Sequence, residues 1–263
     1  MKHVPRFINK AFRFFPNNSF INKIRCFYYN FFKKPDFKIS FESNYFKVIF
    51  ENSLVLKFYD NPFYDLLYPL NGYLKNYDIK KGDNIIDAGT YIGTFTIYSA
   101  KLTGENGKVI AFEPDKSNYN KLLKNIELNK VNNIITINKG LWNKNEVIEF
   151  DYREDEGSMI AECINGKIKG KIVNCEFVRL DDELKKIGIN KVDFIKMDIE
   201  GAEIEAIEGC REMLKNNNIN LAIASYHIRN NEETCKELEN TFNRIGYRSK
   251  TEFSQHLTTY ACK

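Results

Sequence analysis

The sequence lacks the features that mark disulfide-rich, cysteine-metal and membrane-spanning proteins. Its six cysteines are scattered and none belongs to a C-x-x-C pair, so we expect reduced thiols and no cysteine-based metal centre. No apolar run approaches the roughly 18 residues that a membrane-spanning helix needs. The basic N-terminus carries phenylalanines that Pro16, Asn17 and Asn18 interrupt, which is unlike the apolar core of a signal peptide. Together these absences predict a cytoplasmic protein.

Acidic residues are also absent from the first 35 positions. Eight Lys and Arg residues precede Asp36, interleaved with ten Phe and Tyr residues between Phe7 and Phe32. The pattern suits an arm that packs its aromatics on the main domain, a peripheral helix over residues 1–38 on an anionic membrane surface, or a nucleic-acid patch. The net charge of the whole chain is only +4, which by itself does not indicate a nucleic-acid partner.

Beyond this arm, two β-runs around Glu51-Asn52 predict a hairpin over residues 45–59, and residues 65–77 have the pattern of a short helix. We therefore divide the chain into an N-terminal extension, 1–75, made of a basic aromatic helical arm and a β-hairpin, and a main domain, 76–263.

The main domain alternates apolar runs of strand length with segments of helical periodicity. The expected strands are 84–86, 108–112, 134–137, 192–197 and 221–226, and the expected helices are 94–102, 116–129, 201–215 and 232–245. Two further β-runs, 247–250 and 257–262, suit an antiparallel hairpin at a sheet edge, and 147–152, 168–175 and 176–180 suit a β insertion. This alternation predicts an α/β fold, with a mostly parallel sheet covered by helices on both faces.

The ends of the first two strands carry residues suited to a nucleotide-like cofactor. Asp87, Gly89 and Gly93 form a strand–turn–helix transition in which Gly89 lets the backbone approach a ligand and Gly93 permits close packing. Asp87 could hold an ammonium group. Tyr91 occupies a position where the dinucleotide fingerprint requires glycine, which argues against a pyrophosphate cofactor. Glu113, at the tip of the next strand, is placed to accept both hydroxyls of a ribose.

Trp142 is the only tryptophan in the chain and follows the third strand. We name it as a candidate wall of an adenine pocket, with packing as the alternative.

The stretch Asp198 to Glu203 follows the fourth strand and is unusually acidic. It could supply a catalytic or substrate-orienting carboxylate, a divalent-cation site, or acids that cap the following helix. Capping accounts for Glu203 better than for Asp198 and Glu200. We name Asp198 as a candidate catalytic residue and assign no metal ligand.

His227 follows the fifth strand. A neutral imidazole there could accept the proton of a hydroxyl that is being alkylated. We name His227 as the first candidate for this base and Asp198 as the second, with a satisfied loop histidine as the alternative.

These residues resemble those of S-adenosylmethionine-dependent methyltransferases of the FkbM type. The matching segments are 86–93, 111–115, 118–129, 178–184 and 192–203, and Lys196-Met-Asp-Ile-Glu-Gly-Ala-Glu203 is the most specific. The resemblance runs from about Lys80 to Tyr247. It implies a Rossmann-like class I methyltransferase sheet of seven strands, with the last strand antiparallel. It also implies S-adenosylmethionine bound at Asp87, Gly89, Gly93 and Glu113, and Tyr91 stands where such proteins often carry Asn.

The resemblance also implies an O-methyltransferase, and we expect its acceptor to be a hydroxyl of a sugar, glycan or glycolipid. A lipid-linked acceptor would place the enzyme at the cytoplasmic membrane face, where the basic aromatic arm would help. Two alternatives remain open. One is a binding or scaffold protein on the same fold, tethered by the arm. The other is a nucleic-acid methyltransferase, which is disfavoured because the acidic stretch after the fourth strand would repel phosphate and carries no Asn-Pro-Pro-Tyr-like motif.

Overall fold

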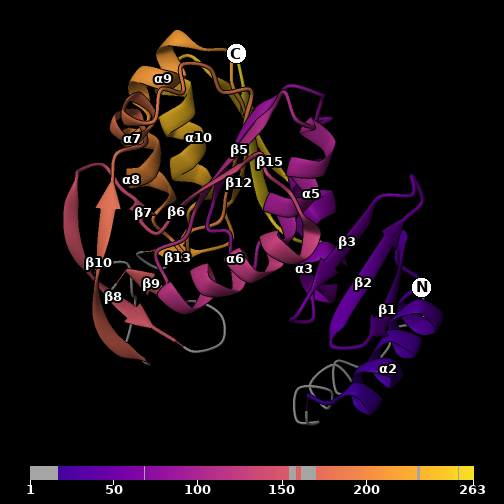
Figure 1. The fold of residues 1–263 in the computed structure, drawn as a ribbon. Coiled ribbons are helices and arrows are strands. Elements are labelled where there is room, and N and C mark those ends of the chain that lie inside the picture. Colours follow the sequence, from indigo (N-terminus) through magenta and orange to yellow (C-terminus); the bar gives the residue numbers. More distant parts are fainter. Residues whose placement is uncertain (1–16, 68, 154–157, 161–169, 230–231, 254) are drawn as a thin grey trace.

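The computed structural model describes residues 17–67, 69–153, 158–160, 170–229, 232–253 and 255–263 (Figure 1). The basic and aromatic residues before Asn17 therefore lie outside the described residues. The central sheet has seven strands in the order β15-β16-β12-β11-β4-β5-β6. These strands are β4 (Asn84–Ala88), β5 (Lys108–Phe112), β6 (Ile134–Ile137), β11 (Phe194–Met197), β12 (Asn220–Ala224), β15 (Arg248–Glu252) and β16 (Thr258–Cys262).

Strand β16 runs antiparallel to both of its neighbours, whereas the pairs from β12 to β6 are all parallel. The predicted class I sheet, with an antiparallel closing strand, is therefore confirmed. The chain builds outward from β4 to β6 and then returns to place β11 on the other side of β4. The strand order reverses between β4 and β11, and ligands of open α/β sheets bind outside the carboxyl ends of strands at such a point.

Alternate residues of the central strands enter two separate cores. Ile86 and Ile110 pack against α7 (Leu180–Lys186), α8 (Glu203–Glu208), α9 (Arg211–Asn216) and α10 (Cys235–Arg244). Ile85 and Val109 face the opposite side, with α3 (Phe63–Leu67), α4 (Pro69–Tyr73) and α5 (Thr94–Thr103). Because side chains alternate along a strand, burial on both faces requires the nearly continuous apolar runs that the sequence shows.

Two expected helices are each divided in the structure. Over residues 201–215, α8 and α9 are separate because Asp181 accepts hydrogen bonds from the backbone N–H groups of Glu212 and Met213, at 3.0 and 2.9 Å, and so starts a new helix. Over 65–77, α3 and α4 are separate and α4 begins at Pro69, which has no N–H with which to continue a preceding helix.

The N-terminal part contains α2 (Ser19–Tyr28), a π-helical turn η1 (Tyr29–Lys33) and three antiparallel strands, β1 (Phe37–Glu42), β2 (Tyr45–Phe50) and β3 (Val55–Phe58). Strand β1, which we did not expect, adds a third strand to the predicted hairpin. The buried side of this sheet shares one apolar core with α5 and the central sheet, so the domain boundary at residue 75 remains a prediction. Within the described residues, no helix combines the length and apolar character that a membrane span requires.

Two asparagines of α6 (Lys116–Asn129) fasten this N-terminal sheet to the main domain. Asn129 accepts a hydrogen bond from the backbone N–H of Lys57 at 2.9 Å and donates to the carbonyl of Lys57 at 2.6 Å. Asn125 accepts from the N–H of Tyr59 at 3.0 Å and donates to the carbonyl of Ile92 at 2.9 Å. The side chains of α6 thereby satisfy backbone groups of β3 and of the chain that follows it.

A second, smaller sheet is inserted between β6 and β11. It contains β7 (Gly140–Leu141), β8 (Glu146–Tyr152), β9 (Met159–Ile160) and β10 (Lys171–Val178), in the order β7-β10-β8-β9. The expected strands 168–175 and 176–180 form one strand here, because Cys175 and Glu176 pair consecutively with Ile148 and Val147 of β8. Residues 168 and 169 lie outside the described part of the chain. This sheet lies beside the carboxyl ends of the central strands (Figure 1).

Candidate functional site

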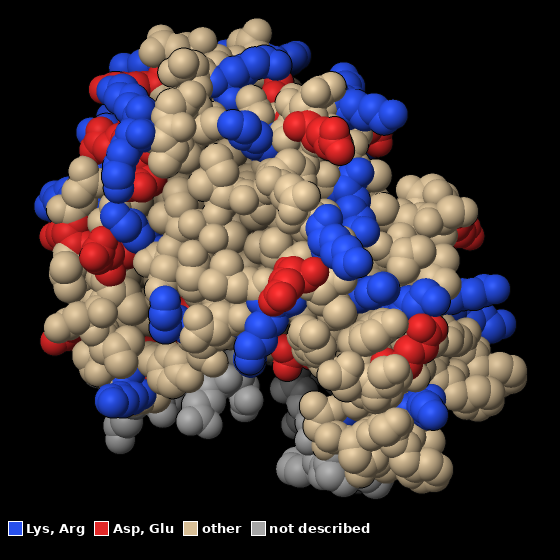
Figure 2. Space-filling view, viewed as in Figure 1, with Lys and Arg blue, Asp and Glu red and all other residues tan. Residues whose placement is uncertain are grey.

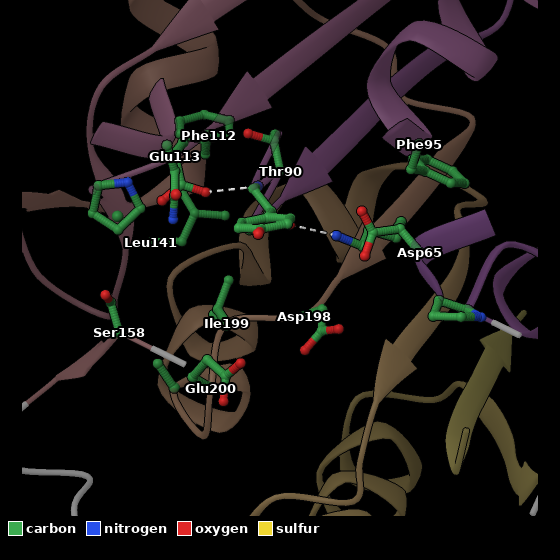
Figure 3. Close-up of a pocket in the computed structure, with 18 of the residues that line it drawn as sticks. Asp65, Thr90, Phe95, Phe112, Glu113, Leu141, Ser158, Asp198, Ile199 and Glu200 are labelled. Atoms are coloured by element: carbon green, nitrogen blue, oxygen red, sulfur yellow. Dashed lines mark hydrogen bonds between the residues drawn. The ribbon is translucent and has the colours of Figure 1, made fainter. Parts of the chain in front are cut away.

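A cavity of about 420 Å³ opens beside the carboxyl ends of β4, β5 and β11 (Figure 3), which is a size typical of small-molecule sites. The central sheet, the short helices α3 and α4 and the inserted sheet all contribute to its wall. Four predicted site residues line the cavity: Gly89, Tyr91, Glu113 and Asp198. The other four are not among its lining residues: Asp87, Gly93, Trp142 and His227.

The loop after β4 is held in a left-handed conformation at three positions. Gly89 has a φ of 76°, Tyr91 of 51° and Gly93 of 86°. A Cβ on Gly89 would overlap the carbonyl oxygen of Asp198, and one on Gly93 would overlap the side chain of Leu122 in α6. Both positions therefore require glycine for close packing as well as for conformation. We expected Gly93 to permit close packing of a helix on a strand, and its close neighbour is instead Leu122 of helix α6. At Gly89 the closest backbone is that of the protein itself, at Asp198.

Glu113 lies at the end of β5, is 5% exposed and faces the cavity. Its carboxylate accepts hydrogen bonds from the backbone N–H groups of Tyr91, at 2.8 Å, and Asp115, at 3.1 Å. Burial raises the pKa of Glu113 to about 8, although both hydrogen bonds oppose this shift. Further hydrogen-bond donors from a ligand would favour the ionised form.

Lys196 is a buried cation in the middle of an otherwise apolar strand, and we did not assign it a role from the sequence. Its Nζ lies 3.0 Å from Oδ1 of Asp87 and donates to the carbonyl of Gly89 at 2.6 Å. Asp87 is fully buried and also accepts a hydrogen bond from Thr96 at 2.5 Å. Asp87 therefore holds the ammonium group of Lys196 and stabilises the glycine loop from below. The prediction that it holds a ligand ammonium stays untested.

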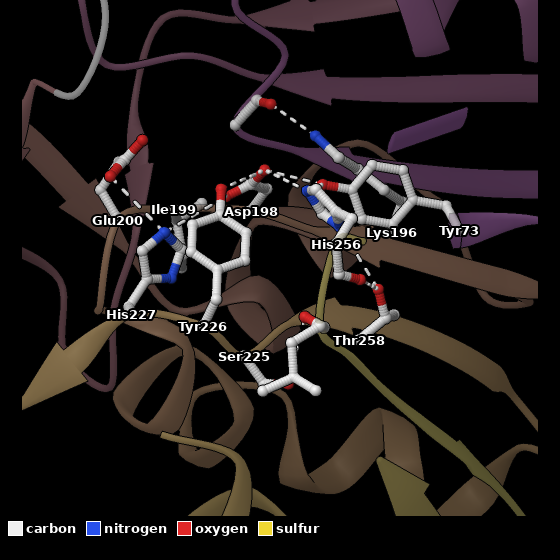
Figure 4. Close-up of polar contacts among 12 residues, drawn as sticks. Tyr73, Lys196, Asp198, Ile199, Glu200, Ser225, Tyr226, His227, His256 and Thr258 are labelled. Carbon is white, nitrogen blue, oxygen red and sulfur yellow. Dashed lines mark hydrogen bonds and ion pairs between the residues drawn. The ribbon is translucent and has the colours of Figure 1, made fainter. Parts of the chain in front are cut away.

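Asp198 lines the cavity on the side opposite Glu113, and hydroxyl and imidazole groups surround its carboxylate (Figure 4). Tyr73 donates to Oδ2 at 2.7 Å, and the Tyr226 hydroxyl lies 3.3 Å from both carboxylate oxygens. His256 lies 3.8 Å away. Burial opposes ionisation of Asp198, but contact with His256 and the charges of His227 and Lys196 outweigh it and hold the pKa of this carboxyl below its usual range. Asp198 is therefore ionised at neutral pH.

His227 lies behind Asp198 and is surrounded by carboxylates. Its Nε2 is 3.5 Å from Asp198 and 3.5 Å from Glu200, and its Nδ1 is 3.0 Å from Glu203. Burial lowers the pKa of His227, but the negative charges around it, that of Glu203 first, outweigh burial and raise the pKa well above its ordinary value. The raised pKa disfavours the neutral ring that a base requires, and the base role that we predicted for His227 stays untested.

The acidic stretch also contains a turn that Glu203 stabilises. Its Oε1 accepts hydrogen bonds from the backbone N–H groups of Ile199, at 3.1 Å, and Gly201, at 3.2 Å. Both donors lie in the turn before α8, and α8 has no side-chain capping hydrogen bond among the described residues, so Glu203 stabilises the turn and does not cap the helix as we expected. Trp142 packs with Phe150 and Phe177 in the core of the inserted sheet, and its neighbour Leu141 lines the cavity instead.

Sequence reasoning missed Tyr73, Lys196, Tyr226 and His256 as contributors to the site. Lys196 carried a usable signal, since a lysine within a fully buried strand needs an anionic partner. Tyr73 and His256 carried none, because only the fold brings residues 73, 198 and 256 together.

The buried ion pair of Lys196 and Asp87 leads to a prediction about stability. Replacing Lys196 by Met should lower the free energy of unfolding by about 3–5 kcal/mol, because Asp87 would keep a buried charge without its cation. Adding Asp87→Asn to Lys196→Met should recover a large part of the loss. Urea denaturation followed by circular dichroism measures both changes.

The matched control is Lys185→Met, since Lys185 pairs with Glu212 at 2.7 Å on the exposed surface, where solvent screens the pair and its loss should change the free energy of unfolding far less. Equal losses for Lys196→Met and Lys185→Met, or no recovery in the double variant, would contradict the structural role of the pair.

Comparison with known proteins identifies the family of this fold. Residues 87–249, more than half of the chain, match the family described as the methyltransferase FkbM domain. The chain is 28% identical over 160 residues to methyltransferase sdnD of Sordaria araneosa, covering 49% of this chain and 60% of that protein. It is 25% identical over 143 residues to methyltransferase 1 of Beauveria bassiana (strain ARSEF 2860), covering 48% and 57%.

A solved structure of methyltransferase FkbM from Methylobacillus flagellatus KT shares the fold, with a TM-score of 0.51 at 19% identity over 72% of this chain and 45% of that chain. The chain thus spans less than two thirds of the length of each of these relatives. The match over more than half of the chain shows that the chain belongs to the methyltransferase FkbM family.

Proposed function

We propose that this protein transfers a methyl group from S-adenosylmethionine to a hydroxyl of a sugar, glycan or glycolipid. The observation that carries the proposal is the ionised Asp198, which faces the same cavity as Glu113 from the opposite side (Figure 3). In this proposal Glu113 would accept hydrogen bonds from the ribose of the donor, and Asp198 would face the hydroxyl of the acceptor.

The cavity has unused polar groups that suit the cofactor. The Thr90 hydroxyl is buried, lines the cavity and has no hydrogen-bond partner within the described residues. Glu113 lies beside it at the tip of β5, where a carboxylate can accept both ribose hydroxyls. Gly89, Thr90, Tyr91 and Glu113 would hold the cofactor, and Leu141 offers an apolar surface on the same wall.

When bound, the cofactor supplies a methyl group on sulfonium: the acceptor oxygen gains a carbon, the sulfur keeps the electrons of its broken bond, and the hydroxyl proton must leave. Asp198 is the group that we propose receives this proton. The low pKa of Asp198 does not prevent this. Once the hydroxyl oxygen carries the methyl group it is a protonated ether, which is a much stronger acid than a carboxylic acid. Tyr73 and Tyr226 fix the Asp198 carboxylate by hydrogen bonds, so it is oriented before the acceptor arrives.

The acceptor side of the cavity suits a neutral polyhydroxyl compound. Carboxylates of Asp65, Asp198 and Glu200 lie among the aromatic rings of Tyr64, Phe95 and Tyr226. Carboxylates accept hydrogen bonds from hydroxyls, and aromatic faces pack against the apolar faces of sugar rings. The same carboxylates would repel a phosphate backbone, which argues against a nucleic-acid acceptor.

Transfer can be measured with isotopically labelled S-adenosylmethionine and a panel of sugars, oligosaccharides and glycolipids, with the methylated atom identified by mass spectrometry and NMR. We expect an O-methyl product. Asp198→Asn should lower kcat by about 10²–10⁴-fold, because a positioned proton acceptor is lost. Glu208→Gln, an exposed acid on α8, is the control and should retain activity. A product methylated on nitrogen or carbon, or an undiminished Asp198→Asn enzyme, would refute the proposal.

The raised pKa of Glu113 makes a prediction about the cofactor. Its carboxylate is best able to accept two hydroxyls when ionised, so affinity for S-adenosylhomocysteine should rise as pH approaches about 8 and level off above it. Below the pKa the gain is at most about tenfold per pH unit. Calorimetric titrations between pH 6 and 9 measure this dependence.

Glu113→Gln is the isosteric control and should bind weakly at every pH. The same pH slope in wild type and variant would show that Glu113 is not the titrating group. Failure of the wild-type chain to bind S-adenosylhomocysteine at all would favour the binding or scaffold alternative.

We further propose that α2 and η1 rest on a membrane surface, where a lipid-linked acceptor would be presented. Four apolar side chains at helical spacing point outward: Phe20 is 72% exposed, Ile24 40%, Phe27 65% and Phe31 60%. Phe32 adds a fifth. Exposed apolar stripes of this kind are unusual on a soluble surface and suit an interfacial helix.

Charge argues for a lipid occupant. Figure 2 shows a largely uncharged area over α2, at the lower right, with basic side chains near its edge. Lys23, Lys34 and Lys38 are exposed in this segment. Each basic residue near an anionic membrane contributes about 1 kcal/mol, whereas full burial of one phenylalanine contributes about 1.5–3 kcal/mol. The aromatics should therefore dominate the affinity.

Sedimentation with vesicles of phosphatidylglycerol and phosphatidylcholine tests this contact. The full chain should partition at least about tenfold more strongly than the triple variant Phe20→Ser, Phe27→Ser, Phe31→Ser, since three aromatic anchors are removed. The control removes comparably exposed side chains elsewhere, Val147→Ser with Ile228→Ser, which are 64% and 61% exposed. Equal sedimentation of wild type and triple variant, or loss of a dimer without any vesicle binding, would reject the membrane surface.

A further inference from the structure

Asp198, Glu200 and His227 bring three potential metal ligands together at the acceptor side of the cavity. One atom from each, two carboxylate oxygens and an imidazole nitrogen, lie within 4.8 Å of one another. Asp198 and Glu200 line the cavity, and His227 lies directly behind them (Figure 4). We propose that this cluster binds a first-row divalent cation such as Mn²⁺ or Zn²⁺, which holds the acceptor hydroxyl.

The distances suit a shared ion. Nε2 of His227 is 3.5 Å from Oδ1 of Asp198 and 3.5 Å from Oε2 of Glu200. Nitrogen and oxygen ligands at about 2.0–2.2 Å from one metal lie roughly 2.8–3.6 Å from each other, for right-angled to tetrahedral arrangements. Both separations that involve the imidazole fall in this range, so His227 could share one ion with either carboxylate. The three ligand atoms all lie within 4.8 Å of one another, so the carboxylates would close on the ion to complete the site.

The imidazole could offer Nε2 to such an ion, which would displace the proton on that nitrogen. His227 has a side chain that is only 6% exposed, and neither ring nitrogen makes a well-oriented hydrogen bond within the described residues. Nδ1 lies 3.0 Å from Oε1 of Glu203, so Glu203 can hold the ring with Nε2 directed at the other two carboxylates. A carboxylate behind a metal-binding histidine orients the ring in many metal sites.

The local charge also favours a cation. Asp198, Glu200 and Glu203 contribute three negative charges, and within the described residues their ion pairs come from His227 and His256 alone. Lys196 is already paired with Asp87, and Arg229 with Glu205. A divalent ion would balance carboxylates that otherwise repel one another.

The donor set indicates the kind of ion. Imidazole with carboxylates suits first-row transition metals and zinc, whereas Mg²⁺ and Ca²⁺ prefer oxygen ligands alone. Three protein ligands leave coordination positions open toward the cavity. If the proposed transfer to a hydroxyl is correct, the hydroxyl oxygen would take one such position, where the cation would make its proton more acidic. Oδ2 of Asp198, which accepts from Tyr73, would remain available for that proton.

Titration of chelator-treated full chain with MnCl₂, followed by loss of the electron paramagnetic resonance signal of free Mn²⁺, tests the site. We expect one Mn²⁺ per chain, at least about tenfold weaker binding for Glu200→Gln and for His227→Gln, since each loses a ligand, and unchanged binding for Glu208→Gln. Circular dichroism and the Tm report whether each variant is folded. Glu200, whose side chain is 36% exposed, is the safer test if His227→Gln does not fold.

Two results would overturn the proposal: absence of stoichiometric Mn²⁺ binding in the presence and absence of S-adenosylhomocysteine, or binding that Glu200→Gln leaves unchanged. The metal site and the proposed function fail separately. A chain that binds S-adenosylhomocysteine but no Mn²⁺ lacks the metal site only. A chain that binds Mn²⁺ at this cluster but no S-adenosylhomocysteine keeps the site and loses the proposed function.

Discussion

The buried ion pair between Lys196 and Asp87 is the interaction on which the site depends. It joins the two central strands at the point where the strand order reverses. The Lys196 ammonium also binds the carbonyl of Gly89, so it fixes the start of the loop that lines the proposed cofactor side. Its charge further favours the ionised form of Asp198 on the proposed acceptor side. Burying a charged pair in an apolar sheet costs free energy unless its geometry is good. Here the pair contacts the backbone on one side of the cavity and influences the charge of Asp198 on the other.

Much of the fold could be predicted from residue patterns, because these patterns depend on interactions between residues close together in the sequence. The limits of β5, α6 and β6 match the expected ranges, since alternation, capping by Asp115 and helical spacing are all local signals. The expected helix 201–215 is divided because a side chain from another element, Asp181, caps α9. Strand β1 escaped notice because its aromatic pattern continued that of the arm before it.

The site was predictable only in part, for a related reason. Gly89, Tyr91, Glu113 and Asp198 stand at strand ends, and strand ends of a parallel sheet meet at one edge whatever the details of packing. Tyr73 and His256 reach Asp198 from segments far away in the sequence, which no spacing rule can reveal. Trp142 shows the opposite error, since its position suggested a pocket wall and the inserted sheet buried it. Tyr73 comes from α4 and His256 from the segment before β16, so the Asp198 side of the cavity depends in part on segments outside the parallel strands.

The contact between Gly89 and the carbonyl oxygen of Asp198 has a consequence for how such an enzyme can change. The two sides of the cavity touch through backbone atoms, with no side chain between them to be exchanged. A substitution that shifts one loop must therefore shift the other as well. The outer walls of the cavity are lined by side chains of α3, α4 and the inserted sheet, so these walls can change shape without moving this backbone contact.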